Sequence, residues 1–257
     1  MGVRGIKLVL SFVFVLVIAG CATQGSKESS GEKAAFEAYS RLGFEYLQAG
    51  DTGNAKHSFK RSLEINSGYA EAHNGLALTF QLEGDEKLAE DYFRKATRLA
   101  PQSAMIHNNF GAFLFAKQRY QEACKQLARA TEDPFYNRRA QAFENLGRCY
   151  RYLNRDDAAM HAFQRALQVS SNRPVSLVEM SDLLLKKGSF IESEKYFDRF
   201  LVLVENRRVE HYAKSLWVGI RLARHNGNSV RSATYALILK NMYPDSEEYR
   251  KYEESAR

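Results

Sequence analysis

The side chains with the widest chemical range in this sequence are three cysteines and six histidines. The histidines are scattered, and none has a second ligand at the spacing of a metal site. A cysteine nucleophile would need a partner base, and no such partner is evident for Cys124 or Cys149. It also contains no glycine-rich phosphate loop and no nucleophile elbow. We therefore expect a protein that is not an enzyme and holds no metal.

Cys21 stands at the end of an apolar N-terminal run. Two basic residues among the first seven precede the uncharged stretch 8–18. This stretch is too short to span a bilayer, which needs about 20 residues, and the arrangement is typical of a secretory signal. The sequence IAGC at 18–21 resembles the bacterial lipobox. That resemblance implies cleavage between Gly20 and Cys21, loss of residues 1–20 and a covalent lipid on Cys21. A plain export signal with an incidental cysteine is the alternative.

Residues 21–35 are predicted to be a lipidated, flexible tether. The segment ATQGSKESSGEKAA at 22–35 has no aromatic and only one β-branched residue, too little apolar surface to order itself. A flexible chain of this length reaches roughly 20 Å. Ala22, rather than Asp, follows the cysteine, which by resemblance to bacterial sorting rules favours the outer membrane. We expect a periplasm-facing, lipid-anchored protein with no cofactor besides that lipid.

The charge balance argues against nucleic-acid binding. The formal net charge is +7, and removal of residues 1–20, with two basic residues and no acid, leaves +5. Neither a basic face nor a reading module stands out. Frequent Ala, Leu, Glu, Lys and Arg with only four prolines favour helices. We expect neither nucleic acid nor a small-molecule substrate as a partner.

A repeat of about 34 residues runs through the chain after the tether. Its marker is a small residue that recurs in steps of 34, 34, 36, 34 and 38, at Gly43, Ala77, Gly111, Gly147, Ser181 and Gly219. A second small residue follows twelve positions later in five units, and a large apolar residue four positions after that. In the last unit we expect these two places at Ala233 and Leu237.

This spacing is the tetratricopeptide pattern, in which each unit is a helix–turn–helix. It predicts an all-α fold of six units stacked as a right-handed superhelical solenoid. The small residue of the first helix lets the second helix approach closely, because residues three and four apart share a helix face. The predicted units are 36–69, 70–103, 104–137, 140–173, 174–207 and 212–247, followed by a polar tail at 248–257.

A stack of this kind has a concave groove lined by the first helix of each unit. Its N-terminal half should be apolar and its middle basic, a surface that accepts an amphipathic helix or an extended segment. The alternative is that Phe44 and Phe115 only pack between neighbouring helices. The predicted groove residues are Phe44, Leu47, Leu78, Phe115, Arg148, Arg151 and Tyr152.

Cys124 and Cys149 fall on neighbouring helices of units three and four. In an oxidising compartment they could form a disulfide. Two small buried thiols in a helix seam are the alternative.

Five stretches carry a more specific resemblance: IHNNFGAFLFAKQRYQEA, AFENLGRCY, SLVEMSDLLLKKGSFIESEKYFDRF, LWVGIRLAR and NMYPDSEEY. With the lipobox, they resemble the type IV pilus biogenesis lipoproteins of the PilF/PilW pilotin family. The resemblance implies an outer-membrane pilotin for pilus biogenesis. Such a protein binds secretin subunits and promotes their outer-membrane localisation and multimerisation.

Two other function classes share some of these features. A tetratricopeptide scaffold lipoprotein of outer-membrane β-barrel assembly or of cell-wall enzyme complexes would have the same anchor and groove. A thiol enzyme would use Cys124 or Cys149. Identification of a captured partner separates the first class from a pilotin, and a double Cys→Ser variant tests the second.

Overall fold

The computed structural model describes residues 24–255, with side chains from Ser30 onward, so the predicted signal peptide and the Gly20–Cys21 cleavage site lie outside it. Throughout the described residues the chain is helical and contains no strand. The paired helices are α1 (Gln24–Gln48) with α2 (Thr52–Ile65), α3 (Ala70–Glu83) with α4 (Glu86–Leu99), α5 (Ala104–Ala116) with α6 (Tyr120–Ala130), α7 (Arg139–Tyr152) with α8 (Asp156–Val169), α9 (Pro174–Lys186) with α10 (Phe190–Glu205), and α11 (Ala213–His225) with α12 (Ser229–Met242). A single helix, α13 (Glu247–Ser255), ends the chain.

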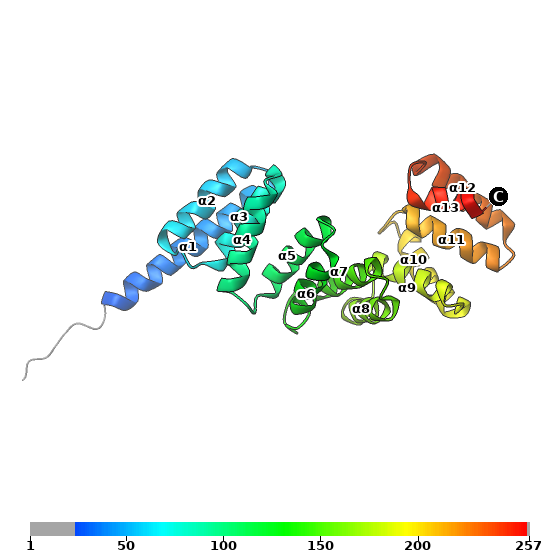
Figure 1. Ribbon diagram of the computed structural model, residues 1–257, viewed down its shortest axis with the longest axis horizontal. Helices are drawn as coiled ribbons and strands as arrows, with labels where there is room; N and C mark the ends of the chain where they lie inside the picture. Colours follow the sequence, from blue (N-terminus) through cyan, green and yellow to red (C-terminus); the bar gives the residue numbers. More distant parts are fainter. Residues whose placement is uncertain (1–23, 256–257) are drawn as a thin grey trace, which may run out of the picture.

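The helix pairs follow one another along an elongated, curved molecule, with α1 at one end and α11–α13 at the other (Figure 1). Each predicted unit contains one pair, except that α1 begins at Gln24, ahead of the predicted start at 36. Each first helix packs on its own partner, and each second helix packs on the first helix of the next unit. This nearest-neighbour packing is the architecture of a solenoid.

An acidic cap sets the start of the second helix in the first two units. Asp51 Oδ1 accepts a hydrogen bond from the Asn54 N–H, and Asp85 Oδ1 from the Leu88 N–H, each at 3.0 Å. Such caps satisfy N–H groups that have no partner inside the helix. Both caps stand eight residues after the small marker residue, so the two helices of a unit keep a fixed register.

The marker residue permits an aromatic ring to lie directly on the first helix. A Cβ atom at Gly43 would come within 2.6 Å of the Phe59 ring, and one at Gly147 within 2.7 Å of the Phe163 ring. Both rings are fully buried. The predicted close approach therefore occurs in both halves of the molecule.

The predicted register of the last unit is wrong. Ala233 and Leu237 are exposed, and Leu237 keeps 60 % of its surface. The cap of α12, Asn228, stands nine residues after Gly219 rather than eight. The added residue lies in α11, which continues six residues past Gly219, whereas α7 continues five past Gly147, and the turn that follows has the same length. The residues of α12 that face the core are Ser232, Tyr235, Ala236 and Leu239.

The predicted flexible tether is also corrected, because α1 begins at Gln24 and includes most of residues 21–35. The prediction considered whether this polar segment could order itself. It overlooked that extending an existing helix avoids the cost of nucleation. Lys33 and Glu37, one turn apart, have their charged groups 4.0 Å from each other.

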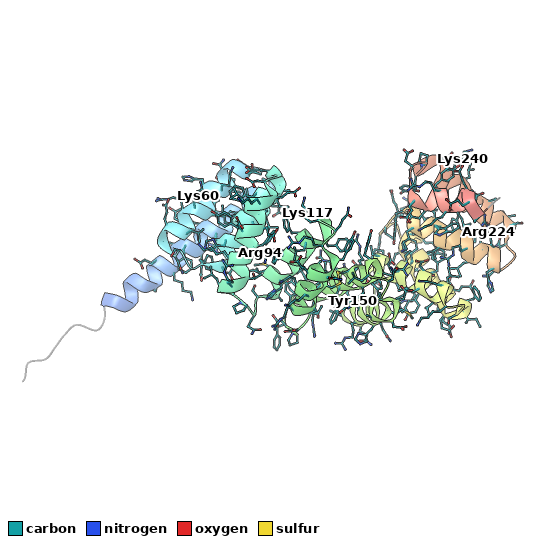
Figure 2. All side chains as sticks on the ribbon, in the orientation of Figure 1. Lys60, Arg94, Lys117, Tyr150, Arg224 and Lys240 are labelled. Carbon is teal, nitrogen blue, oxygen red and sulfur yellow. A yellow bond between two sulfur atoms is a disulfide. The ribbon has the colours of Figure 1, made fainter. Side chains whose placement is uncertain are left out.

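The predicted polar tail forms α13, which packs on the last helix pair. Its Tyr249 and Tyr252 are partly buried against the C-terminal core. Arg224, labelled in Figure 2, donates a hydrogen bond to Ser255 Oγ at 2.8 Å, and its guanidinium lies 5.2 Å from the Tyr252 ring centre. The helix thus covers the end of the stack. Among the described helices, none has the length and apolar character needed to cross a membrane.

Candidate functional site: the groove between the first helices

The N-terminal half of the groove is apolar. Phe44 meets Phe59 edge-on with ring centres 5.0 Å apart, and Leu47 packs on the same cluster. Leu78 packs on the next cluster along the stack. All three predicted groove residues are half-buried. They take part in inter-helix packing and also expose surface to the groove, so the two interpretations of Phe44 are not exclusive.

An aromatic cluster marks the middle of the groove. Phe115 and Tyr152 meet edge-on at 5.1 Å, and Tyr120 stacks on Tyr152 at 4.7 Å. The Arg148 guanidinium lies 5.4 Å from the centre of the Phe115 ring. Three predicted groove residues from units three and four therefore come together, with Tyr120 as a member that the sequence did not single out.

A small recess opens beside this cluster. Its volume is about 160 Å³, and its walls come from α5, α6 and α7. Ala112 is exposed on its floor, at the place where units one and two carry Phe44 and Leu78. The other lining residues are Phe115, Leu127, Asn145 and Arg148.

A larger, polar cavity of about 610 Å³ lies on the other side of Arg148. Unit four contributes Arg148, Arg151 and Tyr152 to its wall, and α13 contributes Glu247, Glu248 and Lys251. The side chains between them include Glu179, Tyr212 and Lys214. The cavity therefore joins three repeat units and the terminal helix.

Ion pairs centred on Asp182 lie in the C-terminal half of the groove, near the polar cavity. The Asp182 carboxylate lies 2.6 Å from a guanidinium nitrogen of Arg151 and 2.6 Å from one of Arg221. Lys214 Nζ is 3.3 Å from Asp182 and 2.9 Å from Glu179. Burial acts to raise the pKa of Asp182, but Lys214, Arg151 and Arg221 outweigh it and hold that pKa below its ordinary value. The pairs link units four, five and six.

A second carboxylate joins units four and five. Glu144 on α7 accepts hydrogen bonds from the Ser176 N–H at 3.1 Å and from its hydroxyl at 2.7 Å. Arg173 also donates to Glu144, at 2.5 Å. A carboxylate near the first turn of α9 is favoured by the helix dipole.

Asparagines take this linking role in the N-terminal half. The Asn109 amide donates to Asn74 at 3.2 Å, and one unit later the Asn145 amide donates to Asn108 at the same distance. Asn74 is fully buried. Buried neutral amides thus join units two to four, beside more exposed ion pairs such as Arg119–Glu90, whereas the buried links between units four and six are charged.

Tyr212 lies at the edge of the polar cavity with its hydroxyl buried. In the described part of the chain this hydroxyl has no hydrogen-bond partner. Burial raises the pKa of Tyr212, and the charges of Glu179 and Glu144 act in the same direction. The phenol therefore stays neutral at physiological pH.

Cys124 on α6 and Cys149 on α7 are joined by a disulfide, with their Cα atoms 5.6 Å apart. This bond links units three and four, next to the aromatic cluster. The Cys149 sulfur also lies 3.0 Å from the carbonyl oxygen of Tyr120. As a thiol it could donate a hydrogen bond there.

The remaining candidates for chemistry have packing roles. His107 is held between the Pro101 carbonyl, at 2.9 Å, and the Gln126 side chain, at 2.6 Å. His73 meets the Ser67 carbonyl at 2.9 Å in the preceding unit. From Gln24 to Ser255, no group of three His, Cys, Asp or Glu side chains is arranged to hold a metal ion.

Sequence reasoning missed several members of the charged half, chiefly Glu179, Lys214 and Arg221. One signal of charged contacts between units was present in the sequence. Asp182 follows Arg151 by 31 residues, close to one repeat, and the two side chains have opposite charges. Lys214 could not be placed in the same way, because residues 206–212 between α10 and α11 are irregular.

Two profiles of the tetratricopeptide repeat match this chain, over residues 32–104 and 102–172. The predicted all-helical tetratricopeptide fold is thereby confirmed, and with it the prediction of a protein-interaction scaffold rather than an enzyme. The function of such scaffolds depends on the surfaces that the repeats present.

The comparison with individual proteins is more specific. The type IV pilus assembly protein PilF of Pseudomonas aeruginosa is 35% identical over 252 residues, which cover 96% of this chain and 98% of PilF. The solved structure of PilF superposes with a TM-score of 0.79 and 36% identity, covering 88% of this chain and 99% of that one. The crystal structure of PilW, a widely conserved type IV pilus biogenesis factor, gives a TM-score of 0.68 and 25% identity, covering 84% of this chain and 97% of PilW. This chain belongs to the tetratricopeptide-repeat proteins of type IV pilus biogenesis.

Proposed function

We propose that this protein is a pilotin: a lipoprotein that holds secretin subunits in its groove and promotes their localisation and multimerisation at the outer membrane. The lipid on Cys21 anchors it to the periplasmic side of that membrane. The groove then presents a bound subunit to the membrane and to other subunits at raised effective concentration. The process makes and breaks no covalent bond, so it needs no catalytic residue.

The observation that carries this proposal is the relation to PilF along nearly the whole length of both chains. Two further features support it. The N-terminus reads as a lipobox ending at Cys21, and the groove offers apolar and cationic surfaces side by side around Phe115 and Arg148.

The anchor is tested with Cys21→Ser. We expect this variant to reach the periplasm folded but soluble, with less secretin multimer in membrane fractions and fewer pili. Mass analysis of the wild-type protein should find an acylated N-terminal cysteine. A free thiol on that cysteine, or an uncleaved N-terminus, would contradict the anchoring.

The partner is tested by deletion and by capture. Deletion of the gene should strongly reduce secretin multimers, and unchanged multimers would refute the pilotin role. Pull-down of the membrane-extracted protein should recover secretin. Recovery of a β-barrel insertion factor or a cell-wall hydrolase instead would support the alternative scaffold.

A further inference from the structure

The recess at Ala112 breaks the apolar floor of the groove. At equivalent places on the neighbouring first helices stand Phe44, Leu78 and Arg148, whose side chains fill the groove surface. Ala112 has only a methyl group there and leaves a volume of about 160 Å³ against Phe115 and Leu127. Engineered apolar cavities of about 150 Å³ accept a benzene ring, so this recess has room for one large apolar side chain.

The walls of the recess are held firmly. Leu127 is fully buried in the core, and Phe115 is braced by Tyr120 and Tyr152 at ring distances of 5.3 and 5.1 Å. The Asn145 amide is held by its hydrogen bond to Asn108. A guest side chain therefore meets a preformed site, which lowers the entropic cost of binding.

Arg148 forms the rim that the recess shares with the polar cavity. Its guanidinium lies over the Phe115 ring. Among the described residues, the Arg148 guanidinium takes part in no ion pair and donates no side-chain hydrogen bond, although Arg151, one turn away, contacts three carboxylates. Arginine can stack on an aromatic face and still offer its N–H edge to a carboxylate.

We propose that the Ala112 recess and Arg148 form one recognition site for a partner segment that carries a large apolar side chain beside an acidic one. The apolar side chain enters the recess over Ala112 and against Phe115. The carboxylate pairs with Arg148 at the rim. The recess selects the size of the apolar side chain, and the Arg148 guanidinium selects the negative charge beside it. One partner segment must meet both conditions.

The spacing of the two side chains reports the conformation of the bound segment. In an extended segment, side chains on one face are two residues apart. In a helix, neighbours on one face are three or four residues apart. Either spacing brings the carboxylate to the rim while the apolar side chain occupies the recess.

This inference rests on the proposed groove function, yet it can be tested without any assumption about the natural partner. The full-length protein in detergent is used to select from a random twelve-residue peptide library. We expect the selected peptides to share a Leu, Met, Ile or Phe with an Asp or Glu two to four residues away. Selection of no peptides, or of peptides without this pairing, would overturn the proposal.

Two variants separate the parts of the site. Ala112→Leu fills the recess and should lower the affinity for the selected peptides at least tenfold. Arg148→Gln should weaken them about tenfold, the effect of losing about 1.4 kcal/mol. Arg148→Glu should reverse the preference, so that peptides with Lys in place of the acid bind better than the originals. Unchanged affinity in Ala112→Leu, or an unchanged charge preference in Arg148→Glu, would refute the site.

Matched controls lie away from the groove. Ala233→Leu enlarges an exposed alanine on α12, and Arg155→Glu reverses an exposed charge at the start of α8. Both should bind the peptides as the wild type does. Equal thermal midpoints for all variants show that the fold is intact.

Secretin capture with the same variants keeps the two proposals distinguishable. If the peptides obey the pairing but Ala112→Leu captures secretin normally, the recognition site exists and the proposed secretin partner does not use it. If secretin is captured but the peptides lack the pairing, the site is wrong and the pilotin proposal stands.

Discussion

The two halves of the groove obey one packing rule and present two different surfaces. In both, a glycine on the first helix accepts a buried ring from the second, as at Gly43 with Phe59 and at Gly147 with Phe163. Yet the position after the glycine is Phe44 in the first unit and Arg148 in the fourth. The comparison teaches that core positions fix the stack while groove positions are free to differ in chemistry.

The halves also differ in what joins their units. Asparagine pairs join units two to four, and partly exposed ion pairs such as Lys56–Glu83 and Arg119–Glu90 join units one to three. Units four to six are joined by the more deeply buried Asp182 carboxylate, paired with Arg and Lys. The Cys124–Cys149 bond lies at the boundary between them. This contrast leads to the following predictions, from the largest expected effect to the smallest.

Removal of the boundary disulfide should cause the largest change. The bond closes a sequence separation of 25 residues, for which chain entropy gives about 3.5 kcal/mol. In the reduced wild type, a hydrogen bond from the Cys149 thiol to the Tyr120 carbonyl offsets part of this loss, whereas the double alanine variant lacks it. In urea, a Cys124→Ala/Cys149→Ala variant should unfold earlier, with hydrogen exchange showing the two halves opening separately. Reductant should lower the urea midpoint of the wild type and leave the midpoint of the variant unchanged. A wild type insensitive to reductant would contradict the expectation.

Loss of the Asp182 carboxylate should damage only the charged half. Asp182→Ala leaves three cations beside a buried, unfilled site, a change that costs about 3–5 kcal/mol at full burial. Because these cations keep a fifth to a third of their surface, we expect about 2 kcal/mol. Exchange protection should fall in α7–α12 and stay constant in α1–α4. Asp157→Ala, which removes an exposed partner of Lys187, should have no measurable effect. Equal loss in both halves would refute the division.

Substitution of the marker glycines should affect the two halves alike. Gly43→Ala and Gly147→Ala each force a Cβ atom against a buried ring. Overpacking costs about 1–3 kcal/mol, partly offset by the better helix propensity of alanine, so each variant should lose about 1 kcal/mol in urea denaturation. Gly53→Ala, where the nearest atom is 3.6 Å away, should not be destabilised. A clear difference between Gly43 and Gly147 would break the common packing rule.

Lowering the pH should cause a smaller loss of stability in the apolar half, through His73. Burial lowers the pKa of His73, the Ser67 carbonyl opposes this, and Lys95 adds to the lowering. The unfolded chain therefore takes up the proton first, and stability falls as pH drops below the ordinary value of about 6.5. Exchange protection of α3 should decrease between pH 7 and 5.

His211 has a lowered pKa from the same main cause, burial, so pH alone does not distinguish the halves. A His73→Gln variant does, because it should lose the pH dependence in α3 and keep it around α11. A variant that retains the full dependence in α3 would show that another group titrates there.

The fold was largely predictable because the repeat is recognised from the spacing of residues along the sequence. Small residues at Gly43, Ala77 and Gly111 recur at 34, and helix geometry converts this period into a packing seam. The extra residue of α11 after Gly219 escaped prediction, since the spacing of the small residues does not show where a first helix ends. The helical start of α1 was missed because the prediction considered only the polar composition of residues 21–35. It did not consider that the helix that follows could extend into this segment.

The groove was predictable only in part. Phe115, Arg148 and Tyr152 were found because they share one helix face at known distances from the marker glycine. The Ala112 recess and the pairing of Arg151 with Asp182 depend on what neighbouring units place opposite, which no single unit specifies. Lys214 and α13 entered the site through irregular segments that have no repeat position.

The most direct test of the account is crosslinking from the groove in intact cells. A photoreactive amino acid in place of Tyr152, which packs on Phe115 and lines the polar cavity, should capture secretin subunits. The same probe at the exposed Arg155, which lines neither the recess nor the polar cavity, should not. Capture of secretin from Tyr152 alone supports a groove that holds the subunit. Equal capture from both positions, or capture of some other protein, would contradict it.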